Sequence, residues 1–157
     1  MLHLIPAPLH RALLPLAHRV RRRWRLWRKV PLAGCSVIVT RPDGAVVLVR
    51  HGYGSGDWCL PGGGLGRGEE PEACARRELQ EELGLSPPAM AAVATLQETI
   101  SGSPHNAYLF HCICADTPRI DAREILEARF FASDALPEPL SAITRRRLDL
   151  WLASQQR

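Results

Sequence analysis

Short apolar runs separated by turn residues dominate the chain from residue 35 onward, and they predict β-strands. The first two runs, CSVIVT at 35–40 and AVVLVR at 45–50, flank Arg-Pro-Asp-Gly, which is typical of a tight turn between paired strands. Further strands are predicted at 93–100, 107–114 and 129–132, and a polar loop is predicted at 101–106. The pattern indicates a sheet assembled from these strands.

Two helices interrupt the strand pattern. One opens near Glu70 with Pro71 in its first turn and stops at Gly84, because proline suits the first turn of a helix and glycine the residue after its last turn. The other covers 141–153, where apolar residues recur at helical spacing. The alternation of strands and helices predicts the α/β (α+β) class and one domain over 31–157.

The first 30 residues form a separate segment with its own charge. They carry seven Arg and one Lys without any acidic residue, so residues 31–157 retain twelve basic and sixteen acidic side chains. A basic amphipathic helix is predicted, with an apolar stripe at Leu9, Leu13, Leu16, Val20, Trp24 and Trp27. We expect this helix to dock on its own domain or on a partner subunit of a homodimer. Binding to an anionic membrane surface, contact with nucleic acid and an organelle transit peptide are the alternatives.

Size and cysteine content point to a cytoplasmic protein. With 157 residues and 46% hydrophobic side chains the chain can bury a core, and its apolar runs are too short to span a bilayer. Five cysteines form no CxxC pair and leave one unpaired in any disulfide scheme, which favours reduced thiols. Cys112 and Cys114 lie on one side of a predicted strand. We expect them to be buried as small apolar residues, with a metal site as the alternative.

Three carboxylates, Glu78, Glu81 and Glu82, fall within about one turn of the first predicted helix in the 31–157 domain. Like charges three and four residues apart oppose helix formation by about 0.2–0.5 kcal/mol per pair. A divalent cation would remove this repulsion, because Mg²⁺ prefers carboxylate, water and phosphate oxygens as ligands. The alternative is a solvated acidic face. A glycine-rich stretch at 61–68 precedes the helix and allows backbone groups to approach an anion or a metal.

The spacing of these residues resembles the signature of the Nudix hydrolase family. Gly63, Glu69 and the run 77–85 (RELQEELGL) match it at each specified position, and WCLPGG at 58–63 is similar to the entry of the same motif. The resemblance extends from about Leu32 to Leu152. It implies a mixed β-sheet between helices and Mg²⁺-dependent hydrolysis of a diphosphate linked to another group, with Mn²⁺ as a substitute.

The resemblance also implies roles for individual residues. Glu78 and Glu82 would be the principal metal ligands, and the carbonyl near Gly62 would complete the ligand set. Glu81 would be a further ligand or the group that orients the attacking water. Arg77, named with Glu78 and Glu81 among the catalytic residues, is expected to form an ion pair with Glu69 or Glu70 and to fix the loop against the helix. Leu79 and Leu83 should pack that helix on the sheet.

Substrate contacts are less specified by the motif. Arg50, Trp58, Gly63 and Gly64 are the candidates, since Arg50 ends a predicted strand next to a second Gly-rich loop at 51–57 and could meet a substrate phosphate, and Trp58 could stack on a base. A surface position for Arg50 and packing beneath the loop for Trp58 are the alternatives. Relatives sometimes place an additional acid where Glu124 and Glu127 stand in this chain, and for each of the two a solvated surface position is the alternative.

Two functions remain compatible with the sequence. The first is hydrolysis of a nucleoside diphosphate derivative, of the nucleoside triphosphate, nucleotide sugar or ADP-ribose type, with a nucleotide-like small molecule as partner. The second is a non-catalytic ligand-sensing or RNA-associated module, since a fold does not determine a function. The intact glutamates favour the first, and nucleic acid is not an expected partner.

Overall fold

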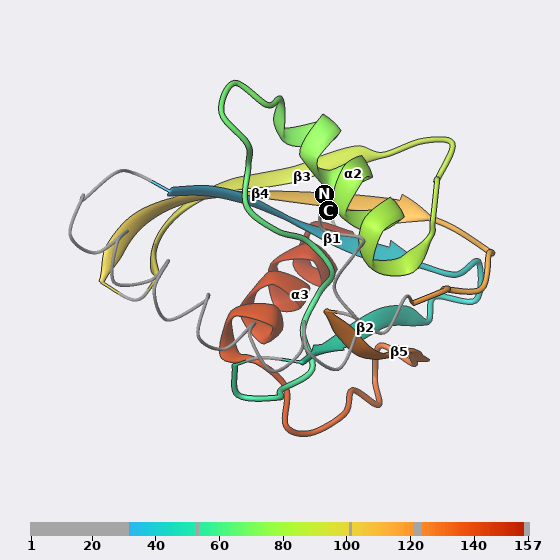
Figure 1. The fold of residues 1–157 in the computed structure, drawn as a ribbon. Coiled ribbons are helices and arrows are strands. Elements are labelled where there is room, and N and C mark those ends of the chain that lie inside the picture. The colour runs from blue at the N-terminus through green and yellow to red at the C-terminus, as the bar shows by residue number, and fades with distance from the viewer. Residues whose placement is uncertain (1–31, 53, 101, 121–123, 156–157) are drawn as a thin grey trace.

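A mixed five-stranded sheet organises the molecule in the computed structural model, which describes residues 32–52, 54–100, 102–120 and 124–155 (Figure 1). In space the strands follow the order β3-β4-β1-β2-β5, and β1 runs parallel to β4 while the other neighbours are antiparallel. The predicted mixed sheet is confirmed, whereas the predicted N-terminal helix lies outside the described residues. The strands are β1 (Leu32–Thr40), β2 (Val46–His51), β3 (Ala91–Ile100), β4 (Ser103–Ile113) and β5 (Ile125–Phe131).

Two helices cover the two faces of this sheet. Helix α2 (Pro71–Leu83) packs on one face and α3 (Ala142–Gln155) on the other (Figure 1). Side chains of a strand alternate between faces, so Val37 joins the apolar cluster under α2 while Ile38 joins the cluster under α3. The sheet therefore separates two apolar cores, and the fold is the predicted sheet between helices.

The ends of α2 are set by the residues that the sequence indicated. Glu70 is the N-cap in an extended conformation, and Pro71 occupies the first helical position. Gly84 takes a left-handed conformation (φ 64°) and donates its N–H to the Gln80 carbonyl at 3.1 Å. Leu79 and Leu83 are fully buried on the sheet, as predicted. The helix is therefore held by its two ends and by one apolar face.

Two predicted boundaries are wrong. The expected polar loop at 101–106 is much shorter, because β4 begins at Ser103 and pairs with Ile100 of β3 and then with the start of β1. The polar residues His105 and Asn106 are thus held as a strand by two neighbours, which local composition cannot indicate. The last strand begins at Ile125 rather than 129, because the whole of 125–131 pairs with β2.

Two expectations from the sequence concern the cysteines and the helices. The five cysteines are free thiols, and Cys112 and Cys114 are buried as expected. Among the described residues, none of the helices has the length and apolar character needed to cross a bilayer.

Candidate active site

The glycine-rich stretch lies along β1 as a short antiparallel partner; we call residues 61–66 the glycine loop. The Val37 N–H donates to the Pro61 carbonyl and the Cys35 N–H to the Gly63 carbonyl, both at 2.9 Å. Gly62, between them, has φ 143°, and a Cβ there would lie 2.3 Å from the Cys35 carbonyl oxygen. Glycine is therefore required at 62 for the loop to approach the strand this closely.

Glu82 meets the loop from α2. Its Oε2 accepts the Gly62 N–H at 3.0 Å, and the residue is only 8% exposed. Burial raises the pKa of Glu82 to about 8; the Gly62 N–H opposes this shift, and the negative charges of Glu78, Glu124 and Glu81 add to it. A carboxyl group held in this way is costly to ionise unless a cation stands beside it.

Glu78 lies against the next residue of the loop. A Cβ on Gly63 would be 2.4 Å from Oε1 of Glu78, so the carboxylate fills the space that a side chain would take. Burial raises the pKa of Glu78, and the positive charge of Arg77 opposes this rise. Glu124, which precedes β5, acts electrostatically on both Glu78 and Glu82. One of the two candidate acids outside the motif is thus within electrostatic range of the cluster, although its own side chain is exposed.

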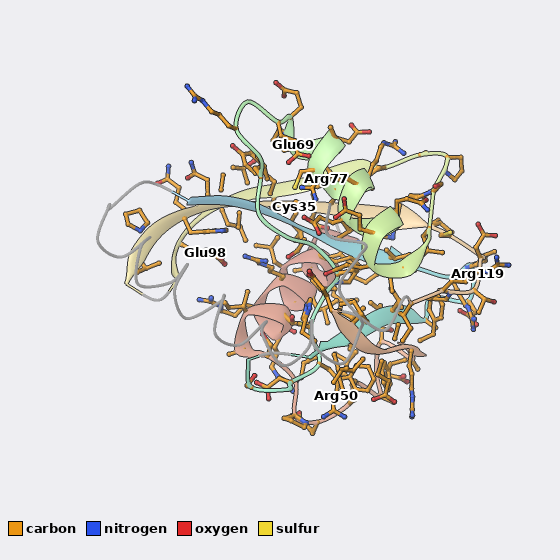
Figure 2. All side chains as sticks on the ribbon, viewed as in Figure 1. Cys35, Arg50, Glu69, Arg77, Glu98 and Arg119 are labelled. Carbon is orange, nitrogen blue, oxygen red and sulfur yellow. The ribbon has the colours of Figure 1, made fainter. Side chains whose placement is uncertain are left out.

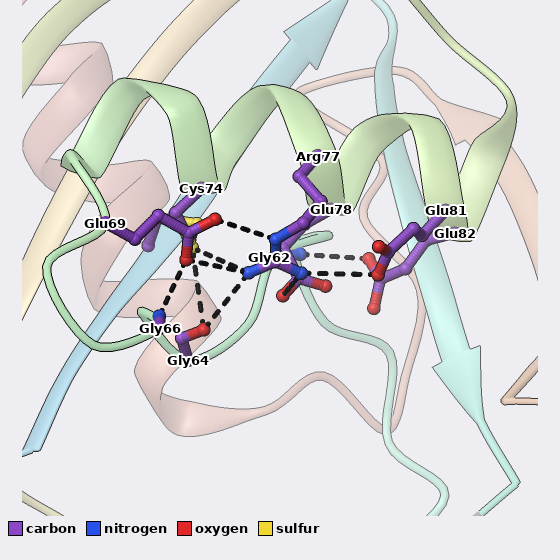
Figure 3. A network of polar contacts seen from close by, with 10 residues as sticks. Gly62, Gly64, Gly66, Glu69, Cys74, Arg77, Glu78, Glu81 and Glu82 are labelled. Carbon is purple, nitrogen blue, oxygen red and sulfur yellow. Dashed lines mark hydrogen bonds and ion pairs between the residues drawn. The ribbon is translucent and has the colours of Figure 1, made fainter. Parts of the chain in front are cut away.

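Arg77 connects the loop, the helix and the carboxylates (Figure 3). Its Nε and Nη2 donate to the two carboxylate oxygens of Glu69 at 2.8 and 3.0 Å, which makes Glu69 the predicted ion-pair partner. Its Nη1 donates to Glu78 at 2.8 Å and to Glu81 at 3.2 Å. Hydrogen bonds from Arg77 and from the Gly66 N–H lower the pKa of Glu69 to about 2. Arg77 therefore fixes the glycine loop against α2.

The contacts of Arg77 also define the present arrangement of the carboxylates. In the part of the chain that the structure describes, no three His, Cys, Asp or Glu side chains are arranged to hold a metal ion on their own. Arg77 Nη1 stands between Glu78 and Glu81, and the side chain of Glu81 is 60% exposed. A cation at this place would have to take over carboxylate oxygens that now accept from the guanidinium.

The donor chemistry nevertheless fits a hard divalent cation. Glu78 and Glu82 offer carboxylate oxygens beside the backbone of Gly62 and Gly63, and both have raised pKa values because their charge is poorly solvated. Oxygen-only ligand sets of this kind suit Mg²⁺ and similar ions. Glu78 and Glu82 are therefore the residues that could hold a cation, and such an ion would relieve the burial of two negative charges.

Arg50 and Trp58, the predicted substrate residues outside the motif, do not join the cluster of Glu78, Glu81 and Glu82. Arg50 donates to the Gly56 carbonyl at 2.9 Å and pairs with Glu127 of β5 at 3.5 Å, well apart from Arg77 (Figure 2). Trp58 is 6% exposed and packs edge-to-face on Phe131 within the cluster under α3. The packing alternative is what the structure shows for Trp58, because a ring this covered has little face left for stacking on a base.

The sequence did not predict a buried polar group that lies on the other face of β1. Arg147 of α3 is 7% exposed and donates to Ser36 Oγ at 2.6 Å and to Glu98 at 2.5 Å. A Cβ on Gly62 would meet the Ser36 Cα at 2.9 Å, so the backbone of Ser36 lies directly beside the glycine loop. The run Arg145–Arg147 looks like a solvated helix face in sequence, and no local signal marks its third member as buried.

The comparisons with known proteins agree with this geometry. The model of the NUDIX domain matches residues 30–152. The chain belongs to the NUDIX domain family. Nudix hydrolases generally use divalent metal ions. The solved MutT NUDIX hydrolase of Burkholderia pseudomallei superimposes with a TM-score of 0.70 at 28% identity, over 77% of this chain and 98% of that chain.

Curated relatives carry pyrophosphohydrolase and diphosphatase names. The chain is 39% identical over 59 residues to an RNA pyrophosphohydrolase of Aeromonas hydrophila, covering 38% of this chain and 33% of that protein. It is 30% identical over 122 residues to the putative 8-oxo-dGTP diphosphatase 3 of Mycobacterium tuberculosis, covering 71% of this chain and 56% of that protein. The chain thus spans between a third and a little over half of the length of these relatives.

Proposed function

We propose that this NUDIX protein is a Mg²⁺-dependent hydrolase that cleaves a diphosphate linkage in a nucleoside diphosphate derivative. The observation that carries the proposal is the buried pair Glu78 and Glu82 held against Gly62 and Gly63. Two carboxylates with raised pKa values at a backbone loop form a place for a cation rather than a solvated surface. A module that only senses a ligand has no need for this costly arrangement.

The roles that we propose for the side chains rest on the resemblance to the family, and the positions of Glu78 and Glu82 support them. Glu78 and Glu82 would hold the ion, with the Gly62 carbonyl as a backbone ligand and Glu81 as a further ligand or the group that orients water. When bound, Mg²⁺ neutralises the charge of phosphate oxygens and acidifies water. Because its side chain is exposed, Glu81 can approach a water molecule on the open side of the cluster.

Arg77 and Glu69 supply the frame for this chemistry. The two-point ion pair between them holds the glycine loop at a fixed distance from α2, and Glu78 lies between the two elements. Diphosphate hydrolysis depends mainly on positioning and on charge stabilisation. We propose that the catalytic contribution of Arg77 is to orient Glu78 through the 2.8 Å hydrogen bond from Nη1.

The substrate class rests on the family and on the names of relatives. The RNA pyrophosphohydrolase and 8-oxo-dGTP diphosphatase relatives support a nucleotide-bearing pyrophosphate as the substrate. The substrate panel should therefore contain 8-oxo-dGTP, ordinary nucleoside triphosphates, RNA with a 5′-triphosphate, ADP-ribose and a nucleotide sugar. We expect hydrolysis of at least one nucleotide compound at the diphosphate bond.

The test is a release assay for phosphate, pyrophosphate and nucleotide with Mg²⁺, with chelator, and with Mn²⁺ added after chelation. We expect activity with Mg²⁺ or Mn²⁺ and none with chelator. The Glu82→Gln variant should lose most of kcat, because an amide is a weak ligand for a hard cation. Hydrolysis that persists in chelator, or a Glu82→Gln protein at the full rate, would refute the proposal.

We infer a cytoplasmic location from the five free thiols, which suit a reducing compartment. Residues 1–31 lie outside the described residues, so three expectations for this segment stay predictions. These are the division into 1–30 and 31–157, a homodimer, and contact of the basic segment with an anionic membrane surface.

A further inference from the structure

Two thiols lie in contact beneath the glycine loop. Cys35 of β1 and Cys74 of α2 are both buried, and their sulfur atoms are 3.4 Å apart. The two residues are 39 positions apart in the chain. We propose that Cys35 and Cys74 form a reversible disulfide cross-link when the protein meets a peroxide, and that this cross-link changes the geometry of the candidate active site.

The position of the pair connects it to the site. The Cys35 N–H donates to the Gly63 carbonyl at 2.9 Å. Cys74 Sγ donates to the Gly64 carbonyl at 3.6 Å and accepts from Arg77 Nη2 at 3.5 Å. A disulfide requires the sulfur atoms to come within about 2.05 Å, so they must move together by roughly 1.4 Å. It also removes the thiol hydrogen that Cys74 donates to Gly64.

The chemistry balances with hydrogen peroxide as a two-electron oxidant. One thiol, as thiolate, attacks the O–O bond to give a sulfenic acid, and hydroxide leaves as water after taking up the thiol proton. The second thiol then attacks the sulfenic sulfur, the S–S bond forms and a second water leaves. Two thiols and one peroxide thus become one disulfide and two waters, and a dithiol reductant returns both hydrogens.

The surroundings favour a cross-link over further oxidation. A sulfenic acid formed on either sulfur has the other thiol as its immediate neighbour, and the pair is too buried to admit a large second reactant. Burial raises the pKa of both Cys35 and Cys74, so the thiolate fraction is small and the reaction is slow. A cross-link over 39 positions also restricts the unfolded chain, which favours the folded form of the oxidised protein over its unfolded form.

The first test measures the cross-link itself and does not depend on any enzymatic activity. The intact protein is treated with hydrogen peroxide, its free thiols are alkylated, and it is digested with trypsin without reduction. Cleavage after Lys and Arg places Cys35, Cys59 and Cys74 in different peptides. We expect a linked peptide pair containing Cys35 and Cys74 that dithiothreitol separates. Both thiols recovered alkylated, or each oxidised without a link, would overturn the proposal.

The second test measures the consequence for the site and rests on the proposed function. The substrate identified by the panel is turned over before oxidation, after it, and after reduction. We expect oxidation to lower kcat by at least tenfold and reduction to restore it. Cys74→Ala should keep its rate under peroxide. Cys112→Ala should respond like the wild type, because Cys112 is buried opposite Val39, beyond the part of β1 that bonds the glycine loop.

The two readouts separate the possible failures. A linked peptide with an unchanged rate would overturn the effect on the active site. A chain that turns over no nucleotide fails the proposed function, while the peptide map still decides whether the cross-link forms. If Cys74→Ala does not fold, the wild-type peptide map and the Cys112→Ala protein carry the test.

Discussion

The buried carboxyl group of Glu82 should make the metal-free protein less stable as the pH rises. Its pKa is raised from an ordinary 4.5 to about 8 in the folded protein. Between these values the unfolded chain has released the proton and the folded chain retains it. Stability that is fully present below about pH 4.5 is therefore lost progressively until about pH 8.

The size of this effect follows from the shift. Each pKa unit corresponds to about 1.4 kcal/mol, so the penalty grows by about 3 kcal/mol between pH 5 and pH 7.5. Glu82→Gln has no proton to release, so its free energy of unfolding does not fall through this ionisation. Its amide oxygen can still accept the Gly62 N–H. The variant should therefore become more stable than the wild type as the pH rises, by an amount on the order of 3 kcal/mol.

Urea unfolding in chelator at pH 5, 6, 7 and 7.5 measures the difference directly. Glu81→Gln is the matched control, because its side chain is 60% exposed and its replacement should change stability by less than about 0.5 kcal/mol at any pH. Added Mg²⁺ should then raise the stability of the wild type and leave Glu82→Gln nearly unchanged. A difference between wild type and Glu82→Gln that does not change with pH would refute this account of the site.

Three further predictions concern the core, the loop and the N-terminal segment. Leu79→Ala should cost about 2–5 kcal/mol in urea unfolding, because Leu79 is fully buried between α2 and the sheet, and a smaller loss would contradict that packing. Gly63→Ala should reduce kcat at least tenfold with the protein still folded by circular dichroism, since its Cβ displaces the Glu78 carboxylate. Gly64→Ala should retain the rate, because its Cβ would meet nothing closer than 3.9 Å. Deleting residues 1–30 should lower the melting temperature if the segment docks, whereas loss of co-sedimentation with anionic liposomes alone would favour membrane binding.

Sequence reasoning succeeded where the determining contacts are local. Pro71 and Gly84 mark the ends of α2 through their own backbone preferences, and the spacing of Glu78 and Glu82 places both on one helix face. The approach of the glycine loop to these residues was indicated by the motif. Its depth, however, depends on β1, whose backbone leaves no room for a side chain at Gly62.

The remaining features depend on residues distant in the chain. Arg147 reaches Ser36 across 111 positions, and the two thiols of Cys35 and Cys74 meet across 39. The early start of β4 is likewise decided by pairing with β1 and β3 rather than by its own polar residues. Such contacts arise only after the sheet has formed. The periodicity and propensity of the local sequence therefore do not predict them.

The attachment of the glycine loop to β1 has a consequence for how this protein can change. Each rung that joins them links one main-chain amide to one main-chain carbonyl: Val37 to Pro61, Cys35 to Gly63, and Leu65 to Ala33. These main-chain hydrogen bonds form regardless of which side chains face outward. Arg67, exposed at the tip of the loop, can therefore be exchanged by natural drift or by design while the carboxylates keep their positions, whereas Gly62 and Glu69 cannot.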